Sequence, residues 1–411
     1  MPMDAMTATP SLRRHNLDAV LAAAWDSEAF TASDVIAAVG LTRSTAIDVV
    51  DELTARGLLA EMPNARAVGE YSKGRPARRF AFRPDAGVVV GVDAGRGHLT
   101  ATVADLRGRT IGASRLTVDP ELDSPERRRR AAEATVDAAL TRARRSRDAI
   151  VALCVGVPAP VDRHGRSPVH HDGFWARMNP DFVDTFAAWA PLVRVENDAT
   201  LAAVAERTHG AAVECADFVA LLAGERFGAG ISVDGRLLRG THGGAGETVA
   251  FDRVEGVGSA WGLAPRCVEA ARAALASGAL PADSALRTVD PDTLEAKTVL
   301  DLAAAGDAGA LGVAREVGAA LAGVAAIFGS LFDVERVIVS GAIAAGAEPI
   351  IAAAIDAIPP SLHLPPPQIV ASSLGADIVS IGAVAAAVEA ARTHALDLDV
   401  FALPEDDRAR A

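Results

Sequence analysis

The sequence has little cysteine, and its three cysteines, Cys154, Cys215 and Cys267, are far apart. An odd number at this spacing excludes a disulfide framework and a CxxC zinc pair. No charge-free apolar run reaches the ~18 residues of a membrane helix, and no basic segment followed by an apolar run opens the chain. We therefore expect no membrane span, no signal peptide and a cytoplasmic protein.

Lysine and aromatic residues are also scarce. Only Lys73 and Lys297 are lysines among 40 basic residues, and aromatic residues make up 4% of the chain, whereas 50% of it is hydrophobic. This hydrophobic fraction is typical of a globular protein and excludes a disordered one. With 411 residues, the chain is long enough for two or three domains that each bury a core.

Acidic residues exceed basic ones, and the excess is unevenly distributed. The formal charge is −13, yet residues 1–86 hold ten basic and eleven acidic side chains, so nearly all of the excess falls in residues 87–411. Within the first segment, the stretch from Arg66 to Arg83 carries six basic groups against one acid, Glu70. An acidic body with one basic strip argues against a membrane-surface protein and leaves one place for an anionic partner.

Residues 11–60 have the pattern of three short helices. Thr31-Ala-Ser-Asp34 predicts a capping box, Gly40 predicts a tight turn, and Thr42 can cap the helix that follows. Two helices joined by such a turn form a helix-turn-helix, whose second helix can enter the DNA major groove. The residues expected to contact DNA from this helix are Thr42, Arg43, Ser44 and Thr45.

Residues 61–82 predict a hairpin with a basic tip, like the wing of a winged helix. Arg75 precedes a proline and is held extended, which suits insertion into a narrow minor groove. Three helices and a hairpin also occur in protein-interaction modules, but the basic strip favours DNA. The wing residues expected to contact DNA are Lys73, Arg75 and Arg78.

A polar cluster follows a strand-like segment near the middle of the chain. Val193 to Val195 alternate like the end of a strand, Glu196-Asn-Asp198 comes next, and the following residues are helical in pattern. Ligands of open α/β sheets bind where a strand gives way to a helix. A carboxylate there can take a proton from a bound hydroxyl. The simpler alternative is that Asn197 or Asp198 only caps the helix.

Glycine-rich turns recur along the body of the chain. A buried strand at 88–92 leads into Asp93-Ala-Gly-Arg-Gly97, and a second strand leads into Gly224-Glu-Arg-Phe-Gly228, which is a weak internal duplication. The segment Gly240-Thr-His-Gly-Gly-Ala-Gly-Glu247 follows. Glycines this dense permit close approach to a ligand, or a tight crossing of chains.

Other segments are assigned from their patterns alone. We expect helices from Ser124 to about 147, at 181–190, and at about 259–278, 294–305 and 307–332. Residues 166–180 have no regular pattern and contain His170, His171 and Asp172. This segment is either a loop that covers a ligand or a long connection.

Taken together, these motifs resemble the ROK family (repressor, open reading frame, kinase), in particular its DNA-binding branch. The resemblance spans nearly the whole chain. It implies an α/β fold in which a winged helix-turn-helix (1–86) precedes a two-lobed actin-like, sugar-kinase-type (ribonuclease H-like) body (87–411). Lobe one would hold residues of about 87–200 with a C-terminal helix of about 385–400, and lobe two would hold about 201–384.

The resemblance also implies roles for single residues. Asn197 would contact sugar hydroxyls, Asp198 would match the general base of the kinase members, and Glu247 and Glu269 would accept bonds from sugar hydroxyls. The former phosphate loops would contain Asp93, Gly95, Gly224 and Gly228.

Departures from the family pattern affect the expected chemistry. Kinase members carry Asp-x-Gly-Gly-Thr, whereas this chain has Arg96 in place of a glycine and lacks the threonine, and Arg226 replaces a glycine in the second loop. A phosphate cradle needs unhindered backbone N–H groups, so ATP is disfavoured. Ala250 replaces the family's zinc-ligating histidine and Cys267 alone remains of its cysteines, so no metal is expected.

We therefore expect a transcriptional regulator that acts as a repressor. It would bind operator DNA and sense a carbohydrate without phosphorylating it. Asp198 would be a vestigial catalytic base. The resemblance implies a homodimer or homotetramer. The alternative is an active ATP-dependent sugar kinase with an accessory DNA-binding domain.

Overall fold

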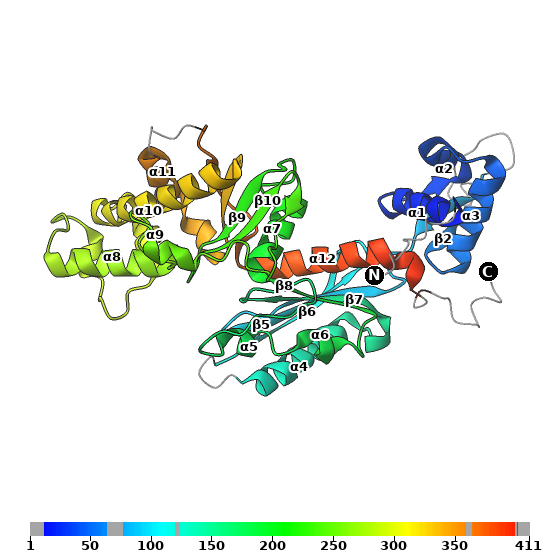
Figure 1. The fold of residues 1–411 in the computed structure, drawn as a ribbon, viewed down its shortest axis with the longest axis horizontal. Coiled ribbons are helices and arrows are strands. Elements are labelled where there is room, and N and C mark those ends of the chain that lie inside the picture. Colours follow the sequence, from blue (N-terminus) through cyan, green and yellow to red (C-terminus); the bar gives the residue numbers. More distant parts are fainter. Residues whose placement is uncertain (1–11, 64–76, 120–123, 359–363, 399–400, 402–411) are drawn as a thin grey trace, which may run out of the picture.

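The structure is a computed structural model that describes residues 12–63, 77–119, 124–358, 364–398 and 401. Along its longest axis lie a small N-terminal domain at one end and a helix-rich lobe at the other, with a second lobe between and below them (Figure 1). A long helix close to the C-terminus runs through the middle and reaches the N-terminal domain.

The N-terminal domain is a winged helix in which three helices pack on a small antiparallel sheet. Thr31 forms the predicted capping box with Asp34, Gly40 ends the second helix at a φ of 74°, and Thr42 caps the third. Trp25 stacks on Phe82 with 4.2 Å between ring centroids and closes the core. The elements are α1 (Leu12–Trp25), α2 (Ala32–Val39), α3 (Arg43–Ala55) and a sheet of order β1 (Phe30–Thr31), β3 (Arg79–Phe82), β2 (Leu59–Met62).

Lobe one is built on a five-stranded sheet of order β6-β5-β4-β7-β8. β4 and β7 are buried along their whole length because helices cover both faces of the sheet. β4, β7 and β8 are parallel, so their carboxyl ends meet at one edge. The elements are β4 (Val88–Asp93), β5 (His98–Asp105), β6 (Thr110–Thr117), α4 (Pro125–Ala143), β7 (Ile150–Val157), α5 (Phe174–Met178), α6 (Phe182–Phe186) and β8 (Leu192–Asn197).

Lobe two repeats this plan with a sheet of order β11-β10-β9-β12-β13. Asp234 and Gly235 both have positive φ in the β10–β11 hairpin, as a type I′ turn requires. The elements are β9 (Phe218–Leu222), β10 (Gly228–Val233), β11 (Arg236–Leu237), α8 (Leu263–Ser277), α9 (Ala296–Ala304), α10 (Ala308–Phe332), β12 (Arg336–Ser340), α11 (Glu348–Ala357) and β13 (Gln368–Ala371).

One helix of lobe two, α10, is long and apolar enough to cross a membrane by composition, with a mean hydropathy of 1.6 over its best window. It packs against α8, α9 and α11, and its residues Val317, Leu321 and Val324 lie in the core of the lobe. A core helix of a globular lobe has the same composition, so this helix carries no indication of a membrane.

Two helices join the lobes. α7 (Asp198–His209) covers β9 and β10 of lobe two, and α12 (Ile378–His394) covers β4, β5 and β7 of lobe one. The two helices pack on each other, and an added Cβ at Gly382 would lie 1.9 Å from the Leu201 carbonyl oxygen, so they touch backbone to backbone.

Three predicted boundaries were wrong. The C-terminal helix begins at Ile378 rather than at about 385 and ends at His394. The helix expected at 181–190 is the short α6, Phe182–Phe186. The helix from Ser124 ends at Ala143, because Arg144 takes a left-handed conformation with φ 54° and closes it.

Candidate functional site

The site begins where β8 passes into α7. Asn197 caps α7, because its Oδ1 accepts a hydrogen bond of 3.1 Å from Thr200 N, and its Nδ2 donates to Ala159 O at 3.1 Å. The carboxylate of Asp198 accepts from Ala199 N at 2.8 Å. The helix-cap interpretation is therefore right for Asn197. Asp198, the next residue, stands at the carboxyl edge of the lobe-one sheet.

The carboxyl group of Asp198 has a shifted proton affinity. Burial raises the pKa of Asp198 to about 7, and the negative charges of Glu247 and Asp93 act in the same direction. Burial also raises the pKa of Glu247, against the opposing charge of Arg226. The structure thus brings together three predicted site residues from three segments: Asp93, Asp198 and Glu247.

Glu247 reaches this place through close chain crossings in the glycine-rich segment. An added Cβ at Gly246 would lie 1.8 Å from Ala229 O, and one at Gly243 would lie 1.9 Å from Val161 O. Glu247 itself pairs with Gly228 at the start of β10. Of the two uses proposed for these glycines, tight chain crossing accounts for Gly243 and Gly246. Gly244 has open space around it.

The first glycine turn is held by side chains that the motifs did not single out. His98 Nε2 lies 2.9 Å from Asp93 Oδ2, and the His98 ring fills the space above Gly95, where a Cβ would be 2.4 Å from the ring. Arg128, fully buried in α4, donates to the carbonyls of Ala94 and Gly95.

The second glycine turn is tied to the start of α8. Backbone N–H groups of the N-cap and first turn of α8 donate to carbonyls in and just before the turn: Gly262 to Glu225 at 2.9 Å, Leu263 to Ala223 at 2.8 Å and Ala264 to Gly224 at 3.2 Å. The turn thus supplies the acceptors that the first N–H groups of a helix need. Arg226 lies over the Trp261 ring, 5.4 Å from its centroid.

An ion pair connects the two glycine turns across the lobes. Arg96 Nη1 lies 2.6 Å from Glu225 Oε1, and both side chains are more than half exposed. An exposed pair of this kind contributes little to stability, about 0–1 kcal/mol. Its position matters more, because it joins the two turns in which the sequence predicts the former phosphate loops. Neither Glu225 nor His98 was identified from the sequence as a site residue, because their roles depend on contacts with Arg96 and Asp93 that only the structure shows.

Glu269 lies two turns into α8 and lines an open groove of about 670 Å³ with Trp261, Val268, Arg272 and the start of α9. None of Asp93, Asp198 and Glu247 lines this groove, so the structure does not group Glu269 with them. Nearby Cys267 is buried in the core of lobe two, and burial raises the pKa of its thiol to about 12.

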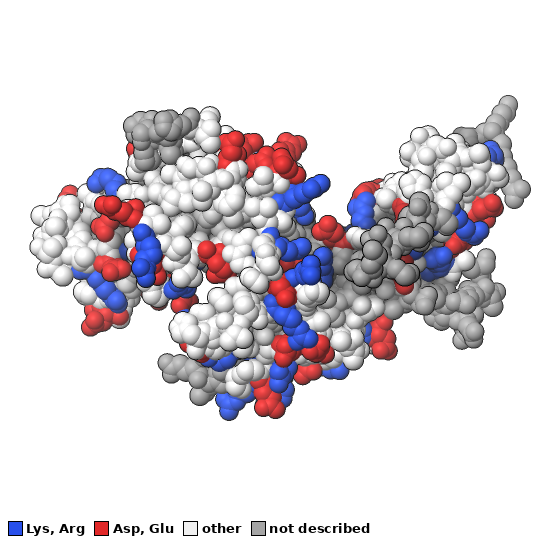
Figure 2. Space-filling model, viewed as in Figure 1, with Lys and Arg blue, Asp and Glu red and all other residues white. Residues whose placement is uncertain are grey.

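The predicted DNA-contacting residues differ in their surroundings. Thr42, Arg43 and Ser44 are exposed on the first turn of α3, and Thr45 is half-buried. Arg78 is engaged within the domain, because it pairs with Glu61 at 2.9 Å and with Asp51 at 3.2 Å. Lys73 and Arg75 lie outside the described residues. Figure 2 shows acidic and basic side chains close together over the winged helix and both lobes.

Comparison with known sequences identifies relatives. Residues 89–389 match the model of the ROK family. Xylose repressors from Caldicellulosiruptor bescii and Bacillus spizizenii are 23% and 24% identical to this chain over 57% and 51% of its length. The alignments cover 58% and 52% of the repressors, so the chain spans about half the length of the curated relatives it matches.

Comparison with solved structures identifies the fold. A ROK family transcriptional regulator, a homologue of the E. coli Mlc protein, superposes with a TM-score of 0.71 at 20% identity, over 95% of this chain and 99% of that one. A ROK family glucokinase from Streptomyces griseus, in complex with glucose and AMPPNP, gives 0.58 at 25% identity, over 74% of this chain and 100% of that one. These neighbours confirm the predicted fold class, and because the family model matches well over half of the chain, the protein belongs to the ROK family.

Proposed function

We propose that the protein is a transcriptional regulator that binds operator DNA through its winged helix and responds to a carbohydrate in the cleft between its lobes, without phosphorylating it. The observation that carries this proposal is the winged helix itself. The regulator structure is similar over 95% of the chain, whereas the glucokinase is similar over 74%. The similarity to two xylose repressors supports repression, rather than activation, as its effect on transcription.

The DNA-binding half of the proposal rests on α3. Its first turn presents Thr42, Arg43 and Ser44 to solvent, and such a turn at the start of a second helix-turn-helix helix reads base edges in the major groove. Arg43 makes no hydrogen bond or ion pair within the described part of the chain, so it is available for a guanine or a phosphate.

The carbohydrate half rests on the polar groups at the cleft. Asn197, Asp198 and Glu247 offer amide and carboxylate oxygens, which suit the many hydroxyls of a sugar. Asp198, Glu247 and Asp93 are close enough for their charges to raise the pKa of Asp198. Glu269 stays a prediction as a fourth contact, which a movement of α8 relative to the cleft would have to bring about.

The absence of phosphorylation rests on the two glycine turns. In the first, the His98 ring covers Gly95 and bonds Asp93; in the second, Arg226 takes the place of a glycine. The Arg96–Glu225 pair bridges the two turns. An ATP triphosphate needs open backbone N–H groups here and would have to displace this pair.

A second candidate function, ATP-dependent sugar phosphorylation, is favoured by one observation. A carboxyl group with a pKa of about 7 is well matched to general-base catalysis near neutral pH. A coupled phosphorylation assay across a sugar panel, with Asp198→Asn as control, separates the candidates. Turnover by the unmodified protein that is lost in Asp198→Asn would overturn the non-catalytic proposal.

The main test is a DNA mobility shift with the upstream region of the protein's own gene, repeated across neutral sugars, sugar acids and sugar phosphates. At least one compound should change DNA affinity ~5–150-fold, as a coupling free energy of ~1–3 kcal/mol gives. Glu247→Gln should bind DNA normally but respond less. No DNA binding under any condition, or a full response in Glu247→Gln, would contradict the respective half of the proposal.

Assembly is part of the proposal. Family resemblance supports a homodimer or homotetramer, and two winged helices on one particle would match two half-sites spaced by whole turns of DNA. Closure of the lobes around a ligand would change the spacing of these domains. Light scattering of the purified protein, alone and on DNA, distinguishes the two assemblies from a monomer.

A further inference from the structure

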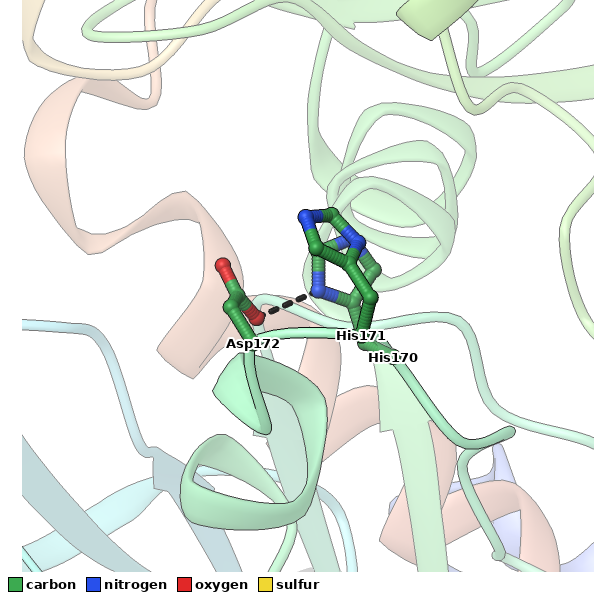
Figure 3. A group of neighbouring side chains, drawn as sticks. All are labelled: His170, His171 and Asp172. Carbon is green, nitrogen blue, oxygen red and sulfur yellow. Dashed lines mark hydrogen bonds and ion pairs between the residues drawn. The ribbon is translucent and has the colours of Figure 1, made fainter.

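The connection between β7 and β8 contains a compact group of three side chains that the proposed function does not use. His170, His171 and Asp172 each offer one ligand atom, and these atoms all lie within 4.8 Å of one another (Figure 3). The three residues occupy a tight turn, because Gly173 N donates to His170 O at 3.0 Å and Gly173 has a φ of 70°. The group is the one such cluster among the residues that the structure describes.

The turn orients two of the three side chains. Asp172 Oδ1 accepts from Phe174 N at 2.8 Å and bonds to His170 Nδ1. This contact sets His170 Nδ1 and Asp172 Oδ1 side by side, so one ion can take both atoms as ligands in place of the hydrogen they share.

Neighbouring aromatic rings restrict the rotation of the His170 side chain. The His170 ring contacts two other rings, that of Trp175 at 4.5 Å between centroids and that of His171 at 4.2 Å. A helix-start turn explains the Asp172–Phe174 bond, but it gives no role to His171. His171 is exposed and makes no hydrogen bond within the described ranges, although its ring lies directly against that of His170 (Figure 3).

We propose that His170, His171 and Asp172 bind a divalent transition metal ion of the zinc type. Two imidazoles and one carboxylate are a ligand set that Zn²⁺ accepts, and three protein ligands leave a fourth position for water or another donor. This site is distinct from the family's zinc position, for which the sequence predicts no metal because Ala250 and Cys267 cannot form it. The new site comes from a different segment and uses no thiol.

A bound ion would hold a segment that starts beside Asn197. Asn197 Nδ2 donates to Ala159 O, and the glycine-rich segment crosses Val161, so the connection is fixed at its beginning. The His170–Gly173 turn lies farther along, and Val169, directly before the turn, is 98% exposed. An ion there would reduce the conformational freedom of this turn and should protect it from proteolysis.

Calorimetric titration of the untagged, full-length, metal-free protein with Zn²⁺ tests the proposal, with Co²⁺ absorption as a second readout of the ligand set. We expect one ion per chain, and affinity reduced at least tenfold in His171→Ala and in Asp172→Asn. Asparagine keeps an oxygen to accept from Phe174 N, so this variant should fold. His164→Ala, in the same connection but outside the cluster, is the matched control.

Three outcomes would overturn the metal site. These are no Zn²⁺ binding at all, binding that His171→Ala and Asp172→Asn leave unchanged, and an equal loss in His164→Ala. Circular dichroism of each variant, compared with the unmodified protein, separates loss of a ligand from loss of fold. The test needs neither DNA nor sugar, so its outcome is independent of the proposed regulatory function.

Discussion

At the scale of single residues, Asp198 should make the stability of the protein depend on pH. Its pKa is raised to about 7 by burial and then by the charges of Glu247 and Asp93, whereas an unfolded aspartate titrates at ~3.9. The folded protein therefore binds a proton at Asp198 that the unfolded chain has already released. As the pH rises from about 4 to about 7, this difference removes free energy of unfolding, and above pH 7 the loss is complete.

Replacing Asp198 by asparagine should remove this loss. Asp198→Asn should be more stable than the unmodified protein at pH 8, by up to ~4 kcal/mol, because the pKa of Asp198 is displaced by ~3 pH units and each unit corresponds to ~1.4 kcal/mol. The gain should shrink toward zero at pH 4–5. Urea unfolding at pH 5 and pH 8 measures both. A gain that does not depend on pH would exclude the charge as its cause.

Asp34 is a useful control, because its pKa is shifted downward, opposite to that of Asp198. Hydrogen bonds from the Thr31 backbone and then from its side chain lower the pKa of Asp34, so this carboxylate stabilises the fold above about pH 4 and loses that effect as the pH falls. Asp34→Asn should therefore be less stable than the unmodified protein at pH 8 and nearly equal to it under acid conditions.

The residues of the site differ in how far the sequence could predict them. Asp198 and Glu247 belong to contiguous motifs, so the sequence alone was enough to identify them as candidate site residues. His98, Glu225 and Arg128 act through partners 5, 129 and 33–50 positions away. Their roles depend on tertiary contacts that no local pattern encodes. The paired state of Arg78 was missed for the same reason.

At the scale of elements, the contact between α7 and α12 makes a sharp prediction. An added Cβ at Gly382 in α12 would lie 1.9 Å from the Leu201 carbonyl oxygen of α7, so Gly382→Ala must push the helices apart. We expect a destabilisation of ~1–3 kcal/mol, as for overpacked cores. Gly312→Ala in α10 is the matched control, since nothing lies within 4 Å of that position and alanine favours a helix by ~0.5–1 kcal/mol. Equal effects of the two variants in thermal unfolding would contradict this packing.

The wing makes a second prediction at this scale. Arg75→Ala should weaken DNA binding for all sequences and reduce the slope of log affinity against log salt by about one, because one phosphate contact is lost. Titrations at several salt concentrations measure the slope. Arg315→Ala, which removes an exposed arginine from α10, should leave both unchanged. An unaltered slope in Arg75→Ala would remove the wing from the interface.

Most elements could be predicted from the sequence because they have one buried face and one polar face. The winged helix was predicted from caps and turns, and α8, α9 and α10 were predicted within a few residues. α12 is the exception at its start. Ile378, Val379, Ser380 and Gly382 are all buried, since the lobe-one sheet covers one side and α7 the other. A helix buried all round has no polar stripe, so periodicity could not locate its beginning.

At the scale of the whole molecule, α12 connects the site to the winged helix. It packs against α7, which begins at Asp198, and its other end meets the winged helix. There Arg392 pairs with Asp26 at 2.8 Å and lies over the Trp25 ring, and Arg14 pairs with Asp397 at 2.6 Å. Buried residues of the winged helix, α7 and α12 form one continuous hydrophobic cluster. If the proposed ligand shifts α7, these packed contacts give the shift a route to the winged helix.

Arg392→Ala tests this connection. Ligand-free DNA affinity should change little, whereas the ligand-induced change should lose up to ~1 kcal/mol, the size of an exposed ion pair with a cation–π contact. Lys297→Ala, which breaks an exposed pair with Asp301 on α9, is the control and should respond fully. Mobility shifts with and without the effective sugar measure both. If Arg392→Ala responds fully, the signal passes from the lobes to the winged helix by another route, of which the Arg107 contacts to Trp25 O and Ser27 O are the next to test.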